Sequence, residues 1–96
     1  MHARVTHFKG EPTKVDEGIR RIKEIVVPGA KKLPGFKGGY WFLDRKTGKG
    51  FGVTLFESEE AVRLSEDAAK QMREQAASTG ATEITAVERY EVVAQA

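Results

Sequence analysis

The sequence predicts an α+β fold in which a four-stranded antiparallel sheet carries two helices on one face. Four segments rich in β-branched and aromatic residues are interrupted by two segments with the apolar spacing of amphipathic helices. Their order is strand, helix, strand, strand, helix, strand, which is typical of the ferredoxin-like split βαβ unit. Because 96 residues are enough for one domain of modest size, we expect residues 1–96 to form a single ferredoxin-like domain.

The first strand and the first helix fall in the N-terminal third of the chain. Residues 3–9 mix β-branched and aromatic side chains and end at Gly10, as a strand does. The apolar residues that follow recur at the spacing of an amphipathic helix: Val15, Ile19, Ile22 and then Ile25 or Val26. We expect Pro28 and Gly29 to end or kink this helix, because proline lacks the backbone donor that a helix interior needs. Residues 30–33 can add one more turn before Pro34 and Gly35 stop it.

A β-hairpin is predicted in the middle of the chain. Residues 36–44 and 49–57 have the composition of strands, and the polar residues 45–48 connect them. Within this connection, Gly48 suits the positive φ that tight hairpins require.

The C-terminal third predicts the second helix and the last strand. Ser58 is followed by two glutamates, which is typical of a helix N-cap with acids in the first turn. Apolar residues at helical spacing extend this helix to residue 77, and we expect Ser78–Gly80 to stop it. Residues 82–93 have the composition of the fourth strand.

Charge and residue types set limits on function. Sixteen basic and 14 acidic residues give a net charge of +2, too small an excess to indicate a nucleic acid or an anionic membrane as partner. The sequence contains no cysteine, which excludes disulfides, thiol catalysis and cysteine-ligated metal centres. It also lacks a dinucleotide fingerprint, a phosphate-binding loop and any apolar run long enough to span a membrane. We therefore expect a cytoplasmic protein without a metal or a cofactor.

The two central strands are apolar on both faces. Tyr40 and Phe42 share one parity, whereas Trp41 and Leu43 take the other. Two helices cover only one face of a sheet, and a contiguous apolar patch on the open face usually marks an interface. We expect a homodimer through the sheet face. The alternative is a sheet that leaves a few apolar residues exposed.

One segment of the third predicted strand suggests a different function. Residues 49–56, KGFGVTLF, nearly match the octapeptide of RNA-recognition motifs, in which aromatic residues on the sheet stack on bases. Val53 stands where that motif has an aromatic residue, and the first strand lacks the partner motif. RNA binding is therefore a weaker alternative, and we do not expect nucleic acid as a partner.

Turn, strand-end and cap residues along the chain carry a family resemblance. They are Pro34-Gly35-Phe36 with Gly38-Gly39-Tyr40-Trp41, the segment TLFESEEA at 54–61, and VERYEV at 87–92. These segments are similar to the dimeric α/β-barrel proteins of the antibiotic-biosynthesis-monooxygenase-like superfamily, and the resemblance covers residues 3–93. It implies two ferredoxin-like protomers whose sheets pack face to face as a barrel. It also implies a cavity between sheet and helices for a hydrophobic aromatic substrate or haem.

The resemblance indicates which residues would take part in chemistry. The haem-degrading branch uses an Asn, a Trp and a helix His, but this chain has no Asn, and its two histidines precede the first helix. The quinone-forming oxygenase branch uses neither metal nor flavin and acts on a phenol as its anion. Its helpers correspond here to the candidate substrate-binding residues Tyr40, Trp41 and Arg89. Because neighbouring strand positions face opposite ways, only one of Tyr40 and Trp41 lines the cavity unless a bulge intervenes, and the sequence leaves open which.

His7, in the middle of the first strand, is the candidate general base because imidazole titrates near neutral pH. The alternative is that His7 is a hydrogen-bonded structural residue. His2 has the opposite parity and lies close to the N-terminus, so the two histidines do not form a metal pair.

Three functions are compatible with these observations. The first is a cofactor-independent, monooxygenase-like enzyme that acts on a small hydrophobic or aromatic molecule. The second is a protein that binds such a molecule without turnover, and the third is a structural dimer whose own aromatic residues fill the cavity. Likeness of fold does not choose among them. Trp41, the only tryptophan, is expected to be largely buried on either face.

Overall fold

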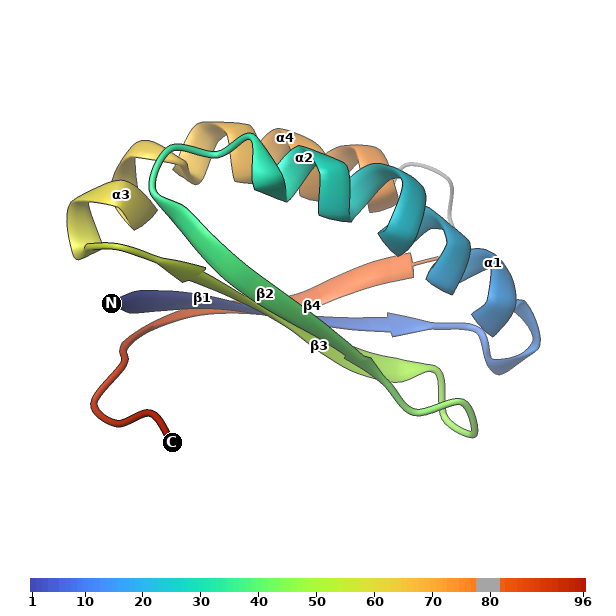
Figure 1. Ribbon diagram of the computed structural model, residues 1–96. Helices are drawn as coiled ribbons and strands as arrows, with labels where there is room; N and C mark the ends of the chain where they lie inside the picture. Colours follow the sequence, from blue (N-terminus) through green and yellow to red (C-terminus); the bar gives the residue numbers. More distant parts are fainter. Residues whose placement is uncertain (78–81) are drawn as a thin grey trace.

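The computed structural model describes residues 1–77 and 82–96, and it has the predicted architecture (Figure 1). Its strands are β1 (His2–Gly10), β2 (Phe36–Leu43), β3 (Lys49–Phe56) and β4 (Thr82–Glu91). They form a four-stranded antiparallel sheet in the order β2-β3-β1-β4. The helices lie over one face of this sheet (Figure 1). The prediction of an α+β, ferredoxin-like fold is therefore confirmed.

The first helical segment is built from four consecutive pieces: the 3-10 turn η1 (Pro12–Lys14), α1 (Val15–Arg21), the π-helical turn η2 (Ile22–Val26) and α2 (Val27–Lys31). It continues past Pro28 and Gly29 to Lys31, so the further turn expected before Pro34 is present in part. The π turn supplies the reason, because the N–H of Val27 donates to the carbonyl of Ile22, five residues earlier. Pro28 then stands in the first turn of α2, where a missing N–H is tolerated.

The π turn also decides which apolar residues face the sheet. Ile22 and Val26 both point to the sheet side, whereas Ile25 is 51% exposed. A π turn contains more residues than an α turn, so positions four apart lie closer to one line along the helix. Of the two residues between which the sequence left a choice, Val26 therefore faces inward.

The second helical segment is divided at Ser65 into α3 (Glu59–Leu64) and α4 (Glu66–Ala77). The predicted cap at Ser58 is confirmed, because its hydroxyl accepts a hydrogen bond from the N–H of Ala61 at 3.1 Å. The predicted stop at Ser78–Gly80 lies outside the described residues. No helix within 1–77 and 82–96 is long and apolar enough to cross a membrane.

The apolar core lies where β3 leads into α3. Phe56 is fully buried there among Leu33, Ala61 and Val62. The ring of Phe36 meets the ring of Phe56 edge to face, with the centroids 6.1 Å apart. This cluster closes one end of the space between sheet and helices.

At the opposite end, β2 and β3 are joined by a tight hairpin. Gly48 has a φ of 77°, as its place in the predicted connection requires. Its N–H donates to the carbonyl of Asp44 at 2.9 Å. Its own carbonyl accepts from the N–H of Gly10 at 2.8 Å, which ties the hairpin to the end of β1.

The two faces of the sheet carry different side chains. The register of β2 against β3 shifts between Phe36 and Gly38. Beyond this shift, Trp41 faces the helices, whereas Tyr40 and Phe42 on the other face are 65% and 47% exposed. Phe51 of β3 stacks on Phe42 with ring centroids 4.8 Å apart. We call Tyr40, Phe42 and Phe51 the outer aromatic patch.

Candidate functional site

A cavity of about 130 Å³ lies between the sheet and the helices. Every strand and both helical segments contribute to it, and its apolar lining includes Phe8, Val15, Ile22, Trp41, Met72 and Ile84. An apolar cavity of about 150 Å³ engineered in another protein stays dry and holds a benzene molecule. The cavity is therefore of the size of one aromatic ring.

Two aromatic rings form the sheet side of this cavity, and each lies against a strand glycine. A Cβ at Gly52 would stand 2.6 Å from Cδ1 of Trp41, and a Cβ at Gly50 would stand 2.7 Å from Cζ of Phe8. Only glycine permits this close approach of a ring to the backbone. The glycines of β3 thus let both rings pack directly against the strand backbone. The space between the rings and the helices remains open as a result.

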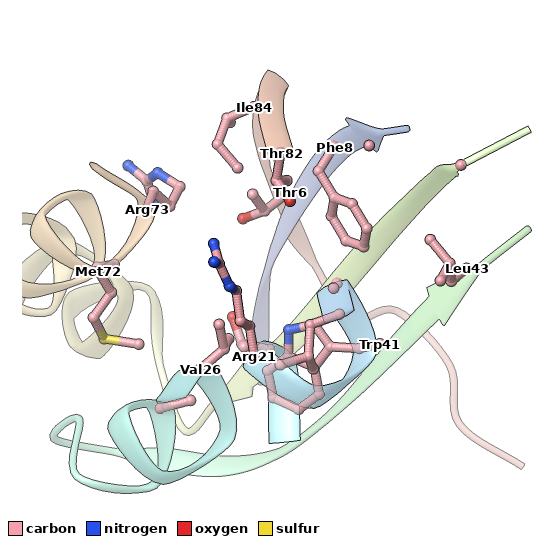
Figure 2. A pocket seen from close by; sticks show the side chains of 18 of the residues that line it. Thr6, Phe8, Arg21, Val26, Trp41, Leu43, Met72, Arg73, Thr82 and Ile84 are labelled. Atoms are coloured by element: carbon pink, nitrogen blue, oxygen red, sulfur yellow. The ribbon is translucent and has the colours of Figure 1, made fainter. Parts of the chain in front are cut away.

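The helix side of the cavity is lined by long side chains, some of which carry charge. Figure 2 shows Met72 and Arg73 extending from α4 on the side opposite Trp41 and Phe8, with Arg21 extending from α1 between them. Methionine adapts to irregular gaps, and its sulfur makes favourable contacts with aromatic rings. The arrangement suits a flat apolar molecule held between rigid rings and an adaptable wall.

Arg4 reaches from β1 to the second helical segment and is 3% exposed. Its Nη2 donates to the carbonyl of Val62 at 2.9 Å, to the Ser65 hydroxyl at 2.7 Å and to Oε1 of Glu66 at 3.1 Å. Its guanidinium carbon also stands 5.2 Å from the centroid of the Phe56 ring. A buried charge persists only when it is paired and hydrogen-bonded, and these contacts meet that requirement.

Glu66 links Arg4 to Arg89. Nε and Nη2 of Arg89 donate to the two carboxylate oxygens of Glu66, both at 2.6 Å, in the two-pronged geometry typical of strong arginine–carboxylate pairs. The hydrogen bonds from Arg89 lower the pKa of Glu66 from 4.5 to about 2, with Arg4 adding to the effect and burial opposing it. Arg89 belongs to this ion cluster and not to the cavity lining.

Two further cations of the cavity lining also have acidic partners. Nη2 of Arg21 donates to Oε1 of Glu17 at 2.9 Å, one helical turn away. Nζ of Lys14 lies 3.8 Å from Oε2 of Glu11. These pairs neutralise the positive charges of Arg21 and Lys14 at the rim of the cavity next to η1 and α1.

His7 lies on the outer face of the sheet. Its Nε2 is 2.7 Å from Oε1 of Glu88, and the hydroxyl of Tyr90 donates to Oε2 of the same carboxylate at 2.9 Å. The hydrogen bonds from Tyr90 and His7 lower the pKa of Glu88. Within 1–77 and 82–96, no group of three or more His, Asp or Glu side chains is placed to hold a metal ion.

The structure does not bring the four predicted site residues together. Trp41 lines the cavity, Tyr40 and His7 lie on the opposite face of the sheet, and Arg89 pairs with Glu66. The choice between Tyr40 and Trp41, which the sequence left open, is thus decided for Trp41. Its side chain is only partly buried, less than expected, because one side of the indole borders the open cavity.

Phe8, Arg4 and Arg73 are among the cavity residues that were not predicted from the sequence. Phe8 shares the parity of Arg4 and Thr6. Because those two residues are polar, this face of the first strand did not indicate that Phe8 lies in the interior. Arg73 follows directly after Met72, a residue of the apolar stripe, and it stands one helical turn from Ala69. That spacing could have indicated that Arg73 faces the interior. However, a charged residue beside an apolar stripe usually lies in solvent.

No family model matches the chain. It is 30% identical over 77 residues to the uncharacterized protein Rv2558 of Mycobacterium tuberculosis, covering 80% of this chain and 33% of that protein. It is 27% identical over 95 residues to the uncharacterized protein Rv2557 of the same organism, covering 98% of this chain and 42% of the relative. The chain therefore spans between a third and a half of the length of these relatives.

Solved structures resemble the whole chain. An antibiotic biosynthesis monooxygenase superposes with a TM-score of 0.70 at 13% identity, covering 98% of this chain and 100% of that one. SnoaB of Streptomyces nogalater, a cofactor-independent oxygenase, gives a TM-score of 0.69 at 11% identity, covering 98% and 94%. The haem degrader MhuD of Mycobacterium tuberculosis gives 0.73 at 20% identity, covering 100% and 99%.

These likenesses define the fold of the chain. It is an α+β protein with the fold of the antibiotic biosynthesis monooxygenases, as the resemblance in the sequence implied. At identities of 20% or less, the likeness establishes the fold alone. The activity has to be argued from the cavity of this chain.

Proposed function

We propose that this chain binds a small aromatic molecule in the cavity between sheet and helices and acts on it as a cofactor-independent monooxygenase. The observation that carries the proposal is the pair of rings, Trp41 and Phe8, which lie against glycines beside a ring-sized space. The similarity in fold to the cofactor-independent oxygenase SnoaB supports the same class of reaction.

In such a reaction a phenol reacts with dioxygen as its anion and becomes a quinone. One oxygen atom enters the substrate, the other leaves as water, and the electrons come from the substrate itself. The contribution of the protein would be to hold the ring, to exclude bulk water and to stabilise the anion. Trp41 and Phe8 supply the first two, and the guanidinium groups of the cavity supply the third.

The alternative function is binding without turnover. The position of His7 favours it, because the candidate general base lies on the outer face, bonded to Glu88, and not at the cavity. We therefore propose that His7 is a hydrogen-bonded structural residue of the sheet. We likewise propose that Tyr40 is an interface residue and that Arg89 positions Glu66.

Haem does not fit this cavity. Neither of the two histidines lines it, since His7 lies on the outer face and His2 borders a separate surface depression near Glu59. Among the described residues, the lining contains no imidazole, thiolate or phenol that could serve as a proximal iron ligand, although Met72 contributes a thioether. The space of about 130 Å³ is that of a single ring and far below that of a macrocycle.

We also propose that the chain forms a homodimer through the outer aromatic patch. Tyr40, Phe42 and Phe51 are 65%, 47% and 38% exposed and lie on neighbouring strands. A second copy presents the same apolar patch, so a two-fold axis through the sheet face would bury both. A specific dimer of this kind buries roughly 1,200 Å² or more in total.

Thermal unfolding in the presence of single-ring aromatic compounds tests the cavity as a ligand site. A ligand that binds only the folded protein at about 100 times its Kd adds about 2.7 kcal/mol to the free energy of unfolding. For a chain of this size, that corresponds to a rise in Tm of several degrees. Oxygen consumption with a bound phenol then separates an enzyme from a carrier. A panel of such compounds that leaves Tm unchanged would contradict the proposed site.

Replacing Trp41 by alanine is expected to weaken binding of such a ligand by about tenfold or more, since the indole supplies a large part of the aromatic contact. Tyr40→Ala is the matched control, because Tyr40 is the neighbouring residue on the opposite face. Isothermal titration should show weakened binding for Trp41→Ala only. Sedimentation should show weakened dimerisation for Tyr40→Ala only. Equal loss of ligand binding in both variants would argue against the cavity.

A further inference from the structure

Among the described residues of the cavity lining, Arg73 is the cation without an ion-pair partner. The other cations of the lining are paired: Arg4 with Glu66, Arg21 with Glu17 and Lys14 with Glu11. Arg73 forms no ion pair with any residue in the ranges 1–77 and 82–96. The half-buried guanidinium therefore brings a positive charge to an apolar space without a carboxylate in ion-pair contact among the described residues.

The same side chain also leaves a hydrogen-bond donor unused. Nη1 of Arg73 is buried and has no hydrogen-bond partner within the part of the chain that the structure describes. Nε of Arg4, which also lines the cavity, is in the same situation. Burial lowers the pKa of the Arg73 guanidinium and the positive charge of Arg4 adds to this effect, whereas the carboxylates of Glu66 and Glu74 oppose it without contacting the guanidinium. Buried donors in native proteins nearly always have a partner, so two in one cavity require an explanation.

We propose that the occupant of this cavity is an organic anion, a single-ring acid whose carboxylate or phenolate oxygen accepts a hydrogen bond from Nη1 of Arg73. The inference rests on the proposed function, in that the cavity is the ligand site, and it narrows the class of ligand. The ring would lie between Met72 and the rings of Trp41 and Phe8, and the acidic group would face α4. An anion there supplies the missing acceptor and the missing countercharge together.

The geometry also predicts that a neutral ring binds less well than an acid. A neutral compound fills the apolar space but leaves the charge of Arg73 uncompensated, and it desolvates that charge further. A charged hydrogen bond in a space of low dielectric constant is stronger than the same bond in water. Discrimination between an acid and its neutral isostere is therefore the property that this arrangement predicts.

The test compares acids with neutral compounds of the same shape near neutral pH. Benzoate is paired with benzamide, and 4-nitrophenolate is paired with 4-nitroaniline, so that the two pairs distinguish a carboxylate from a phenolate. Isothermal titration with the full chain is expected to show about tenfold or more tighter binding for at least one acid than for its neutral isostere. Equal affinities within both pairs would overturn the inference while leaving the cavity as a ligand site. Failure of all four compounds to bind would count against the proposed function itself.

One variant and one control test whether the preference for the acid depends on Arg73. Arg73→Met keeps the length and removes the charge, and it is expected to abolish the preference for the acid while retaining the affinity for the neutral compound. Arg63→Met is the matched control, because Arg63 lies on α3 with its side chain 75% exposed. The ligand-free Tm of Arg73→Met is expected to equal or exceed that of the parent chain, since an unpaired buried donor is removed. A preference for the acid that survives in Arg73→Met, or a lowered Tm that marks Arg73 as a structural residue, would overturn the inference.

Discussion

Replacing Glu66 by alanine is expected to lower the free energy of unfolding by about 3 kcal/mol. The substitution leaves the guanidinium of Arg4, which is 3% exposed, without its carboxylate. The carbonyl of Val62 and the hydroxyl of Ser65 remain as acceptors, but neither carries a compensating charge. Chemical denaturation at neutral pH measures the loss.

Two controls separate the buried ion pair from the exposed one. Arg89→Gln breaks only the half-exposed side of the cluster and is expected to cost less than about 1 kcal/mol. The double variant Arg4→Met with Glu66→Ala is expected to recover most of the loss, because methionine packs against Phe56 without a charge. If Glu66→Ala cost no more than Arg89→Gln, the stability of the buried end of the cluster would not depend on this carboxylate.

The same carboxylate makes stability depend on pH in the acid range. The pKa of Glu66 is about 2 in the folded chain against an ordinary value of 4.5. Between these values the unfolded chain binds more protons, so stability falls as pH falls. The contribution is fully present above about pH 4.5 and disappears as pH approaches 2. Because the cluster is partly exposed to solvent, we expect about 1–2 kcal/mol from this group, and Glu66→Ala should flatten this part of the pH profile.

Replacing Phe51 by lysine is expected to raise the Kd of the proposed dimer by at least about thirtyfold, since an aromatic residue at the centre of an interface contributes about 2 kcal/mol or more. Phe51 stacks on Phe42, whose ring also lies 6.3 Å from that of Tyr40. A lysine there would place an unpaired charge in the middle of the buried patch. Sedimentation velocity of the parent chain should give twice the 10.6 kDa of one chain, and the variant should give 10.6 kDa.

Leu64→Lys is the matched control for this prediction. Leu64 lies on α3, is 66% exposed, and is therefore an equally apolar surface residue on the helix side of the molecule. This variant should remain a dimer. A parent chain that sediments as a monomer at micromolar concentration would contradict the proposed assembly, and a variant Phe51→Lys that remains a dimer would place the interface elsewhere.

The sequence predicted the elements whose signals are local. The Ser58 cap and the positive φ at Gly48 depend on a few neighbouring residues, and both are confirmed. The π turn before Pro28 was not predicted, because it depends on hydrogen bonds between residues five apart. Apolar spacing carries no signal for such a turn.

The candidate site was less predictable than the fold. Trp41 was recognised, but its face depends on the shift between Phe36 and Gly38, which comes from strand pairing. Arg73 and Arg4 are charged, and charged residues are almost never fully buried unless they are paired. Their places in the cavity follow from contacts between α4 and the sheet, which no local pattern of residues contains. The sequence therefore yielded Trp41 but missed Phe8 and the charged residues of the site.

The π turn fixes the angular phase between the two halves of the first helix. Val15 and Arg21 before it, and Ala30 after it, all face the cavity only because the turn contains its present number of residues. Each residue of an α-helix rotates the chain by about 100°. Deleting one residue from 22–26 would therefore turn α1 by about that angle relative to α2 and carry Val15 and Arg21 away from the sheet. The cavity lining therefore depends on the number of residues in this turn more than on which residues they are.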